Sequence, residues 1–273
     1  MIEVPLIDLN DGHKIPQIGL GTWKATDRKE LEQALKTAFE AGYRHIDTAQ
    51  AYGNETYIGD FLRSASMKRD DLFITTKIAV QNFGHKRALN SFKISLSNLQ
   101  TEYVDLLLLH FPVTGLRKKT WQAVEEILAE GKARSIGVSN YTIRHLEEMR
   151  GFAKVMPAVN QIELHVFLQQ PELIKYCQQN NIIVEAYSPL ARGHDFSNQT
   201  IQLIADKHHK SYQQIMLKWL LQKGLVIIPK SVTPERIRQN IDLFDFDLSE
   251  AEMNSIEALD RDMRVCWSPV HVP

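Results

Sequence analysis

Short apolar segments alternate with helical patterns along almost the whole chain. A leading segment at 4–9 turns at 10–12 and returns at 13–15, as a β-hairpin does. Between later strand-like runs, apolar residues recur with helical spacing, as in the segment 29–41, which ends at Gly42. Strict alternation predicts parallel strands joined by right-handed crossovers. The predicted strands are 17–20, 45–47, 72–76, 104–109, 134–138, 158–162, 182–187 and 225–228.

The number of repeats limits the choice of architecture. Eight strand–helix units typically need about 250 residues when the strands close into a barrel, and the chain has 273. The sequence contains no long linker and no shift in composition that would mark a boundary between domains. We therefore predict an α/β fold, a (β/α)8 TIM barrel that follows the hairpin, in a single domain spanning residues 1–273.

Charge and composition exclude several classes of partner. The chain has 32 Lys and Arg against 33 Asp and Glu, and a net charge of −1 gives no electrostatic case for nucleic acid or an anionic membrane. No apolar run approaches the roughly 20 residues of a membrane span, and the first residues have no signal-peptide pattern. Because Cys177 and Cys266 lie far apart and form no CxxC, we predict free thiols and a cytoplasmic location.

Polar and aromatic side chains follow the predicted strands at their C-terminal ends, which is where barrels of this kind carry their sites. Taken singly, each could be a helix cap or a loop residue. Together they predict a functional site at one end of the barrel. They are Trp23, Asp47, Lys77, His110, Ser139, Asn140, Gln161, Tyr187, Pro229, Lys230 and Ser231.

Asp47, Lys77 and His110, together with Tyr52 on the loop after Asp47, have the chemistry of a proton donor. A free phenol has a pKa of about 10 and is a poor acid at neutral pH. The ammonium of Lys77 would lower the pKa of the Tyr52 phenol, and the carboxylate of Asp47 would keep that ammonium charged. His110 could orient a carbonyl oxygen or relay the proton.

A phosphate site is predicted at the start of the helix that follows the last strand. Lys230, Ser231, Thr233 and Arg236 supply two cations and two hydroxyls beside the free N–H groups of a helix N-terminus. No GxGxxG, Walker A, HExxH or GxSxG motif occurs, so a dinucleotide would have to be held in this other way, and we expect no metal. Tyr187 offers a flat face on which a nicotinamide could stack.

Three segments give the chain a resemblance to a known family. They are GYRHIDTA at 42–49 with Glu55 and Gly59, IGVSNY at 136–141, and IPKS at 228–231 with Arg236, Gln239 and Asn240. From Gly12 to about Arg264 the chain resembles the aldo-keto reductases. Within that family the likeness points to short bacterial members, such as 2,5-diketo-gluconate and methylglyoxal reductases.

The resemblance implies a fold and a reaction. The leading hairpin would close the bottom of the barrel. The reaction would be the NADPH-dependent reduction of an aldehyde or ketone to an alcohol by hydride transfer. Tyr52 would donate the proton with the help of Asp47 and Lys77, and His110 would orient the carbonyl.

The resemblance also implies which residues hold the cofactor, NADPH or NADP⁺. They are Ser139, Asn140 and Gln161 for the carboxamide, Tyr187 for the ring, Lys230, Ser231 and Thr233 for the 2′-phosphate, Arg236 and Asn240 for the adenine, and Gly21, Thr22, Asp47, Ser188, Leu190, Val232 and Gln239 elsewhere.

The expected substrate pocket departs from that of the larger members. Only residues 111–115 separate His110 from the next helix, and the tail after Asp260 is short. Both loops normally shape the pocket, so we predict an open site for small or polar carbonyls. We also predict that the protein is a monomer. The expected substrate residues are Trp23, Tyr52, His110, Phe111 and Trp267, with Phe83 as a further rim candidate.

Two other functions fit parts of the same pattern. A metal held by His45, Asp47 and His110, or a Schiff base on Lys77, would make a different kind of barrel enzyme. A protein that binds NADPH as a redox sensor would keep the cofactor residues without catalysing the reaction.

Overall fold

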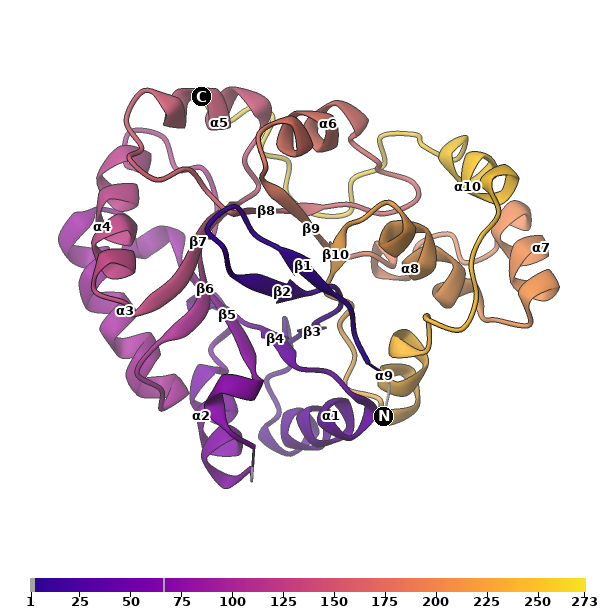
Figure 1. Ribbon diagram of the computed structural model, residues 1–273, viewed down its shortest axis with the longest axis horizontal. Coiled ribbons are helices and arrows are strands. Elements are labelled where there is room, and N and C mark those ends of the chain that lie inside the picture. The colour runs from indigo at the N-terminus through magenta and orange to yellow at the C-terminus, as the bar shows by residue number, and fades with distance from the viewer. Residues whose placement is uncertain (1–2, 66) are drawn as a thin grey trace.

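The computed structural model describes residues 3–65 and 67–273, and in this part of the chain strands and helices alternate as predicted (Figure 1). The strands are β1 (Leu6–Asp8), β2 (Lys14–Pro16), β3 (Leu20–Gly21), β4 (His45–Asp47), β5 (Phe73–Ile78), β6 (Val104–Leu109), β7 (Ala133–Ser139), β8 (Val159–Glu163), β9 (Ile183–Tyr187) and β10 (Val226–Ile227).

The α-helices lie between the strands and surround them (Figure 1). They are α1 (Arg28–Ala41), α2 (Glu55–Ser64), α3 (His85–Leu99), α4 (Arg117–Ala129), α5 (Ile143–Arg150), α6 (Pro171–Gln179), α7 (Gln199–His208), α8 (Tyr212–Gln222), α9 (Pro234–Ile241) and α10 (Glu250–Glu257). Within the described ranges, four short 3₁₀ turns occur in the loops, at η1 (Gln50–Tyr52), η2 (Arg69–Asp71), η3 (Val80–Asn82) and η4 (Ala191–Gly193).

The strands from β3 to β10 pair in sequence order, and each pair is parallel. The two edges of this sheet meet. The Gly19 N–H donates to the Ile227 carbonyl at 2.9 Å, and the Ile227 N–H donates to the Gln17 carbonyl at 3.0 Å. A parallel bridge between Gly21 and Lys230 extends the seam. A Cβ at Gly21 would lie 2.8 Å from the Ile228 carbonyl oxygen, so the seam requires a glycine there. The predicted (β/α)8 barrel is confirmed.

The first helix illustrates how local sequence sets the element boundaries. The carboxylate of Asp27 accepts a hydrogen bond from the Glu30 N–H at the N-terminus of α1, and Leu31 and Leu35 face the core. The helix ends at Gly42, whose φ of 116° lies in the left-handed region that glycine favours. The chain then enters β4, which carries Asp47 to the C-terminal end of the barrel.

The buried strands β5 and β6 have no exposed residue, as expected for strands covered on both faces. The strands at the seam are shorter than predicted. We predicted strands at 17–20 and 225–228, whereas β3 and β10 have two residues each. Residues 17–19 pair with β10 through isolated bridges and separate hydrogen bonds, so the ladder is interrupted where the barrel closes.

The leading hairpin of β1 and β2 lies across one end of the barrel (Figure 1). Its residues Leu9 and Ile15 pack in one apolar cluster with Phe73, Val159 and Val226, which are first residues of β5, β8 and β10. The hairpin therefore closes the N-terminal end of the barrel, as the resemblance implied. In the described ranges, no helix combines the length and apolar character needed to cross a bilayer.

Candidate active site

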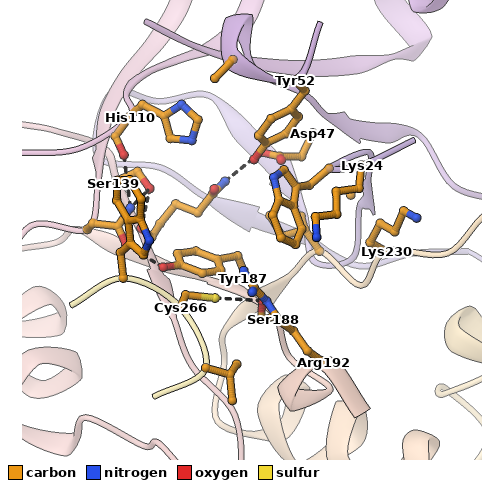
Figure 2. A pocket seen from close by; sticks show the side chains of 18 of the residues that line it. Lys24, Asp47, Tyr52, His110, Ser139, Tyr187, Ser188, Arg192, Lys230 and Cys266 are labelled. Carbon is orange, nitrogen blue, oxygen red and sulfur yellow. Dashed lines mark hydrogen bonds between the residues drawn. The ribbon is translucent and has the colours of Figure 1, made fainter. Parts of the chain in front are cut away.

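A pocket of about 1090 Å³ opens at the C-terminal ends of the strands. Asp47 from the end of β4, Tyr52 from η1 and His110 after β6 contribute to its wall (Figure 2). Lys77 from β5 is completely buried beneath them. Four side chains that are up to 63 residues apart in the sequence (47 to 110) thus lie together at one point, as predicted.

Lys77 is the centre of this cluster. Its ammonium lies 2.7 Å from each carboxylate oxygen of Asp47, and it donates to the Thr48 carbonyl at 2.9 Å. It also contacts the Tyr52 hydroxyl at 3.4 Å. The ammonium is therefore bound firmly by acceptors, and one weaker contact connects it to the phenol.

This environment argues against a Schiff base on Lys77. Burial by itself would lower the pKa of Lys77, but the interactions of the ammonium with Asp47 and Tyr52, above all with the Asp47 carboxylate, outweigh burial and raise the pKa above its usual value. A Schiff base forms from a neutral amine, and this amine is held in its charged form.

The Tyr52 phenol does not have the lowered pKa that we predicted. Burial is the largest contribution and raises the pKa of Tyr52 above its usual value; Lys77 lowers it only in part, and Asp47 raises it further. The predicted lowering by Lys77 is present, but the prediction did not consider burial, which outweighs Lys77 and reverses the net shift. A phenol of ordinary pKa is already protonated at neutral pH, and burial reinforces this state, so Tyr52 holds a proton that it can donate.

His110 faces the same phenol. The two ring centroids are 5.7 Å apart, and the ring planes meet at 74°. Burial, with a smaller contribution from Lys77, lowers the pKa of His110 to about 3, so its imidazole is neutral near pH 7. A neutral imidazole can donate one N–H bond to an oxygen, which favours the first of its two predicted roles, orientation of a carbonyl, over proton relay.

A second group of polar side chains lines the pocket beside His110 (Figure 2). The amide of Asn140 donates to the His110 carbonyl at 3.1 Å, and its oxygen accepts from the Tyr187 hydroxyl at 2.7 Å. Ser139 donates to the Gln161 carbonyl at 3.0 Å. Asn140 has a φ of 66°, a left-handed conformation that Asn tolerates better than most residues. The strand ends of β7, β8 and β9 are thus tied together around one wall.

The predicted cofactor residues divide into two groups. Those that line the pocket are Gly21, Asp47, Ser139, Asn140, Gln161, Tyr187, Ser188, Leu190 and Lys230. Those that do not line it are Thr22, Ser231, Val232, Thr233, Arg236, Gln239 and Asn240.

The second group follows two different patterns. Thr22 is buried, and its hydroxyl donates to the Asp47 carbonyl at 2.9 Å, which is a structural role. The residues after Lys230 lead into α9, and there the Ser231 hydroxyl accepts from the Thr233 N–H at 3.0 Å. Their contacts with a cofactor remain a prediction.

Three cations in the pocket wall were not predicted, namely Lys24, Arg192 and Arg264, and the first two lie against Trp23. The ammonium of Lys24 lies 4.6 Å from the Trp23 ring centroid, and the guanidinium of Arg192 lies 4.3 Å from it (Figure 2). Neither side chain has an ion-pair partner among residues 3–65 and 67–273. Lys24 could have been found, because it directly follows Trp23. Arg192 could not have been found from the sequence. Its position depends on the path of the loop after β9, where three consecutive residues have left-handed backbone conformations.

The rim of the pocket agrees with the prediction except at one residue. Trp23, Phe111 and Trp267 all line it, and Trp267 is 84% exposed. Phe83 is fully buried and packs in the core, so it is not a rim residue.

The short C-terminal tail also forms part of the wall, from Arg264 to Trp267. The carboxylate of Glu163, at the end of β8, accepts from the N–H groups of Val265 at 2.6 Å and Cys266 at 3.2 Å. The tail is thereby fixed to the barrel although it is short.

The alternative metal site is not formed. Across the described ranges, no three His, Cys, Asp or Glu side chains are grouped so as to hold a metal ion. Asp47 is bonded to Lys77, and the His45 ring contacts the Thr75 hydroxyl at 3.0 Å. His110 is therefore left without the two partners that this alternative required.

The fold and the clustered side chains define a (β/α)8 barrel protein with a Tyr–Lys–Asp–His group at the C-terminal ends of its strands. The sequence matches the Aldo/keto reductase family over residues 17–261. The chain belongs to this family.

Relatives and solved structures agree with this assignment. The chain is 43% identical to "Glyoxal reductase" of Bacillus subtilis over 96% of its length and 95% of the relative. It is 43% identical to "Methylglyoxal reductase DkgA" of Escherichia coli, over 98% of each chain. A Bombyx mori aldo-keto reductase solved in complex with NADP has a TM-score of 0.92 at 36% identity, covering 97% of this chain and 96% of that one.

Proposed function

We propose that this protein reduces small or polar aldehydes and ketones with NADPH, and that Tyr52 donates the proton. The observation that carries the proposal is the position of the Lys77 ammonium, 2.7 Å from Asp47 and 3.4 Å from the Tyr52 hydroxyl, at the base of an open pocket. Reduction of a carbonyl needs a hydride at carbon and a proton at oxygen, and this cluster supplies the proton.

The proton step follows from the charges around the phenol. Tyr52 is protonated at neutral pH, as an ordinary phenol is, and burial raises its pKa further. As negative charge develops on a carbonyl oxygen, the phenol gives up its proton, and the ammonium of Lys77 stabilises the phenolate that remains. The neutral imidazole of His110 donates an N–H bond that holds the carbonyl oxygen near Tyr52.

The side chains of the pocket have the chemical groups needed to bind the cofactor. NADPH, when bound, supplies the hydride. Ser139, Asn140 and Gln161 would hold its carboxamide and Tyr187 its ring. Lys230, with the unpaired cations Lys24 and Arg192, would face its negatively charged phosphates. The contacts of Ser231, Thr233, Arg236 and Asn240 with the adenosine half belong to the same proposal.

The rim supports small or polar substrates. The pocket is open, and Trp23, Phe111 and Trp267 supply apolar surface at its edge. The loop after His110 adds only Phe111 to the wall, and the tail after Asp260 adds only Arg264 to Trp267, so these two segments offer few contacts to a large ligand. Glyoxal and methylglyoxal, which appear in the names of two relatives, are compounds of the expected kind.

We also propose that the protein works as a monomer in the cytoplasm. The free thiols of Cys177 and Cys266 suit a reducing compartment. Light scattering of the purified protein tests the first part: a single species near the chain mass of 31.4 kDa is expected, and twice that mass would contradict it.

The proposed reaction is tested with a panel of carbonyl compounds. Purified protein is mixed with NADPH or NADH and each compound, and oxidation of the nicotinamide is followed by absorbance. We expect turnover with methylglyoxal and glyoxal, faster with NADPH than with NADH, and little with bulky ketones. Tight binding of NADPH without oxidation by any carbonyl would instead support the redox-sensor function.

A further inference from the structure

The base of the pocket continues downward as a chain of buried polar groups. One amide nitrogen, Nε2 of Gln161, donates both to Asp47 Oδ2 at 2.8 Å and to Glu185 Oε2 at 2.6 Å. Glu185 lies on β9 and is completely buried. Gln161 therefore connects the Asp47–Lys77 pair to a second carboxyl group that the proposed reaction does not use.

The two bonds fix the orientation of Gln161. Both amide hydrogens point to carboxyl oxygens, so the amide oxygen is the end left for another partner. Gln161 lines the pocket, where the proposed function places the nicotinamide carboxamide. By accepting from the amide nitrogen of Gln161, Glu185 thus helps to keep the amide oxygen available to a bound cofactor.

The other oxygen of Glu185 is poorly supported. Oε1 has no hydrogen-bond partner among the described residues, and His45 Nε2 lies 3.7 Å from it. A buried carboxylate with an unpaired oxygen is unfavourable and tends to take up a proton. Burial, with a further contribution from Asp47, raises the pKa of Glu185 to about 8, although Gln161 and Lys77 act in the opposite direction.

The charge around Glu185 comes from several elements. Its strand neighbours contribute no titratable group, because β8 places Gln161 beside it and β10 pairs Val226 with it. The titratable groups that face it are His45 and Asp47 from β4, Lys77 from β5 and Tyr52 from η1. Lys77 is the one cation in this set, since burial and Lys77 itself keep the pKa of His45 low, at about 3.

We propose that Glu185 is a positioning residue of the active site, which orients Gln161 and, by gaining or losing a proton, sets the charge beneath Tyr52. The proposal rests on the proposed function. A protonated Glu185 leaves one carboxylate beside one ammonium. When Glu185 loses its proton, a second negative charge lies near Tyr52 and makes the phenol hold its own proton more tightly.

The pH dependence of reduction tests whether the ionisation of Glu185 sets the charge beneath Tyr52. Reduction needs a protonated Tyr52, so kcat/KM falls at high pH as the phenol ionises. Glu185→Gln keeps the shape and an acceptor for Gln161 but removes the ionisable group. We expect its alkaline limb to move to lower pH by about half a unit or more relative to wild type. Superimposable profiles would overturn this part.

A matched control replaces another buried carboxylate far from the pocket. Asp105, at the start of β6, is also buried and is paired with Arg69 and Arg134. Asp105→Asn should lower the melting temperature without moving the pH profile. An equal shift in both variants would show a general effect of destabilisation and would contradict the proposal.

The KM for NADPH tests whether Glu185 orients Gln161. Glu185→Leu removes one of the two acceptors, and we expect KM for NADPH to rise roughly tenfold, because a Gln161 amide held only by Asp47 can turn away more easily. Glu185→Gln should restore KM to within about twofold of wild type. Equal values of KM in Glu185→Leu and wild type would contradict this part. If Glu185→Leu does not fold, a KM raised tenfold in Glu185→Gln would contradict it equally.

A spectroscopic measurement separates this inference from the proposed reaction. Near neutral pH, the infrared spectrum of wild type minus Glu185→Gln should contain the carbonyl band of a protonated, buried carboxyl group. This needs no turnover. A missing band overturns the inference even if carbonyls are reduced, and a wild-type protein that reduces no carbonyl overturns the proposed function even if the band is present.

Discussion

The two ends of the barrel are built from the same strands but differ in what they bury. At the N-terminal end, the hairpin residues Leu9 and Ile15 cover an apolar cluster that includes Phe73 and Val226. At the C-terminal end, the same sheet buries an ion pair, Lys77 with Asp47, under an open pocket. This difference indicates that apolar packing at the N-terminal end stabilises the barrel, so that the C-terminal end can bury charged groups.

Lys77→Met should show the largest effect at the C-terminal end. It removes the cation beside Tyr52 and leaves Asp47 buried without its partner. We expect kcat to fall by roughly 10²–10⁴ and the free energy of unfolding to fall by about 3–5 kcal/mol. Steady-state kinetics and denaturant unfolding measure the two. A variant that keeps at least half of the wild-type kcat would contradict the role of Lys77.

Ile15→Ala, at the N-terminal end, should lower the stability of the protein and leave its activity almost unchanged. Ile15 is fully buried beneath the barrel, and its truncation leaves a cavity. We expect a loss of about 2–5 kcal/mol in the free energy of unfolding, with kcat/KM of the folded protein within about twofold of wild type. If kcat/KM fell tenfold while the protein stayed folded, the two ends would not be independent.

Lys230→Glu should have the smallest effect, confined to one part of the pocket. Lys230 lines the pocket, and the proposed function places it at the 2′-phosphate of NADPH. Reversing its charge should raise KM for NADPH about tenfold, equivalent to roughly 1.4 kcal/mol. KM for NADH, which has no 2′-phosphate, should change by about twofold or less and serves as the control. Equal changes with both cofactors would place the phosphate elsewhere.

The sequence was sufficient to predict most of the barrel and the cluster at its mouth. Apolar runs that end in Asp47, Lys77 and His110 are a strong pattern, because parallel strands present their C-terminal ends on one side. Arg192 could not be placed, since its position depends on the path of a loop. The shift in the pKa of Tyr52 could not be predicted either, because it depends on burial, which is a property of the packed barrel.

Glu185 is a different case, because the sequence contains a pattern from which its position could have been predicted. Alternate residues of a strand point the same way, so Glu185 lies on the same side of β9 as Tyr187, and His45 on the same side of β4 as Asp47. A carboxyl group and an imidazole one step below the predicted site therefore indicated a second polar layer inside the barrel.

The central claim is that the Tyr52 hydroxyl delivers the proton. The most direct test is a single turnover of Tyr52→Phe with NADPH already bound and methylglyoxal added. Because Phe keeps the ring and loses only the hydroxyl, NADPH should bind within about twofold of wild type, and its oxidation should slow by roughly 10²–10⁴. Oxidation of bound NADPH at the wild-type rate would contradict the account.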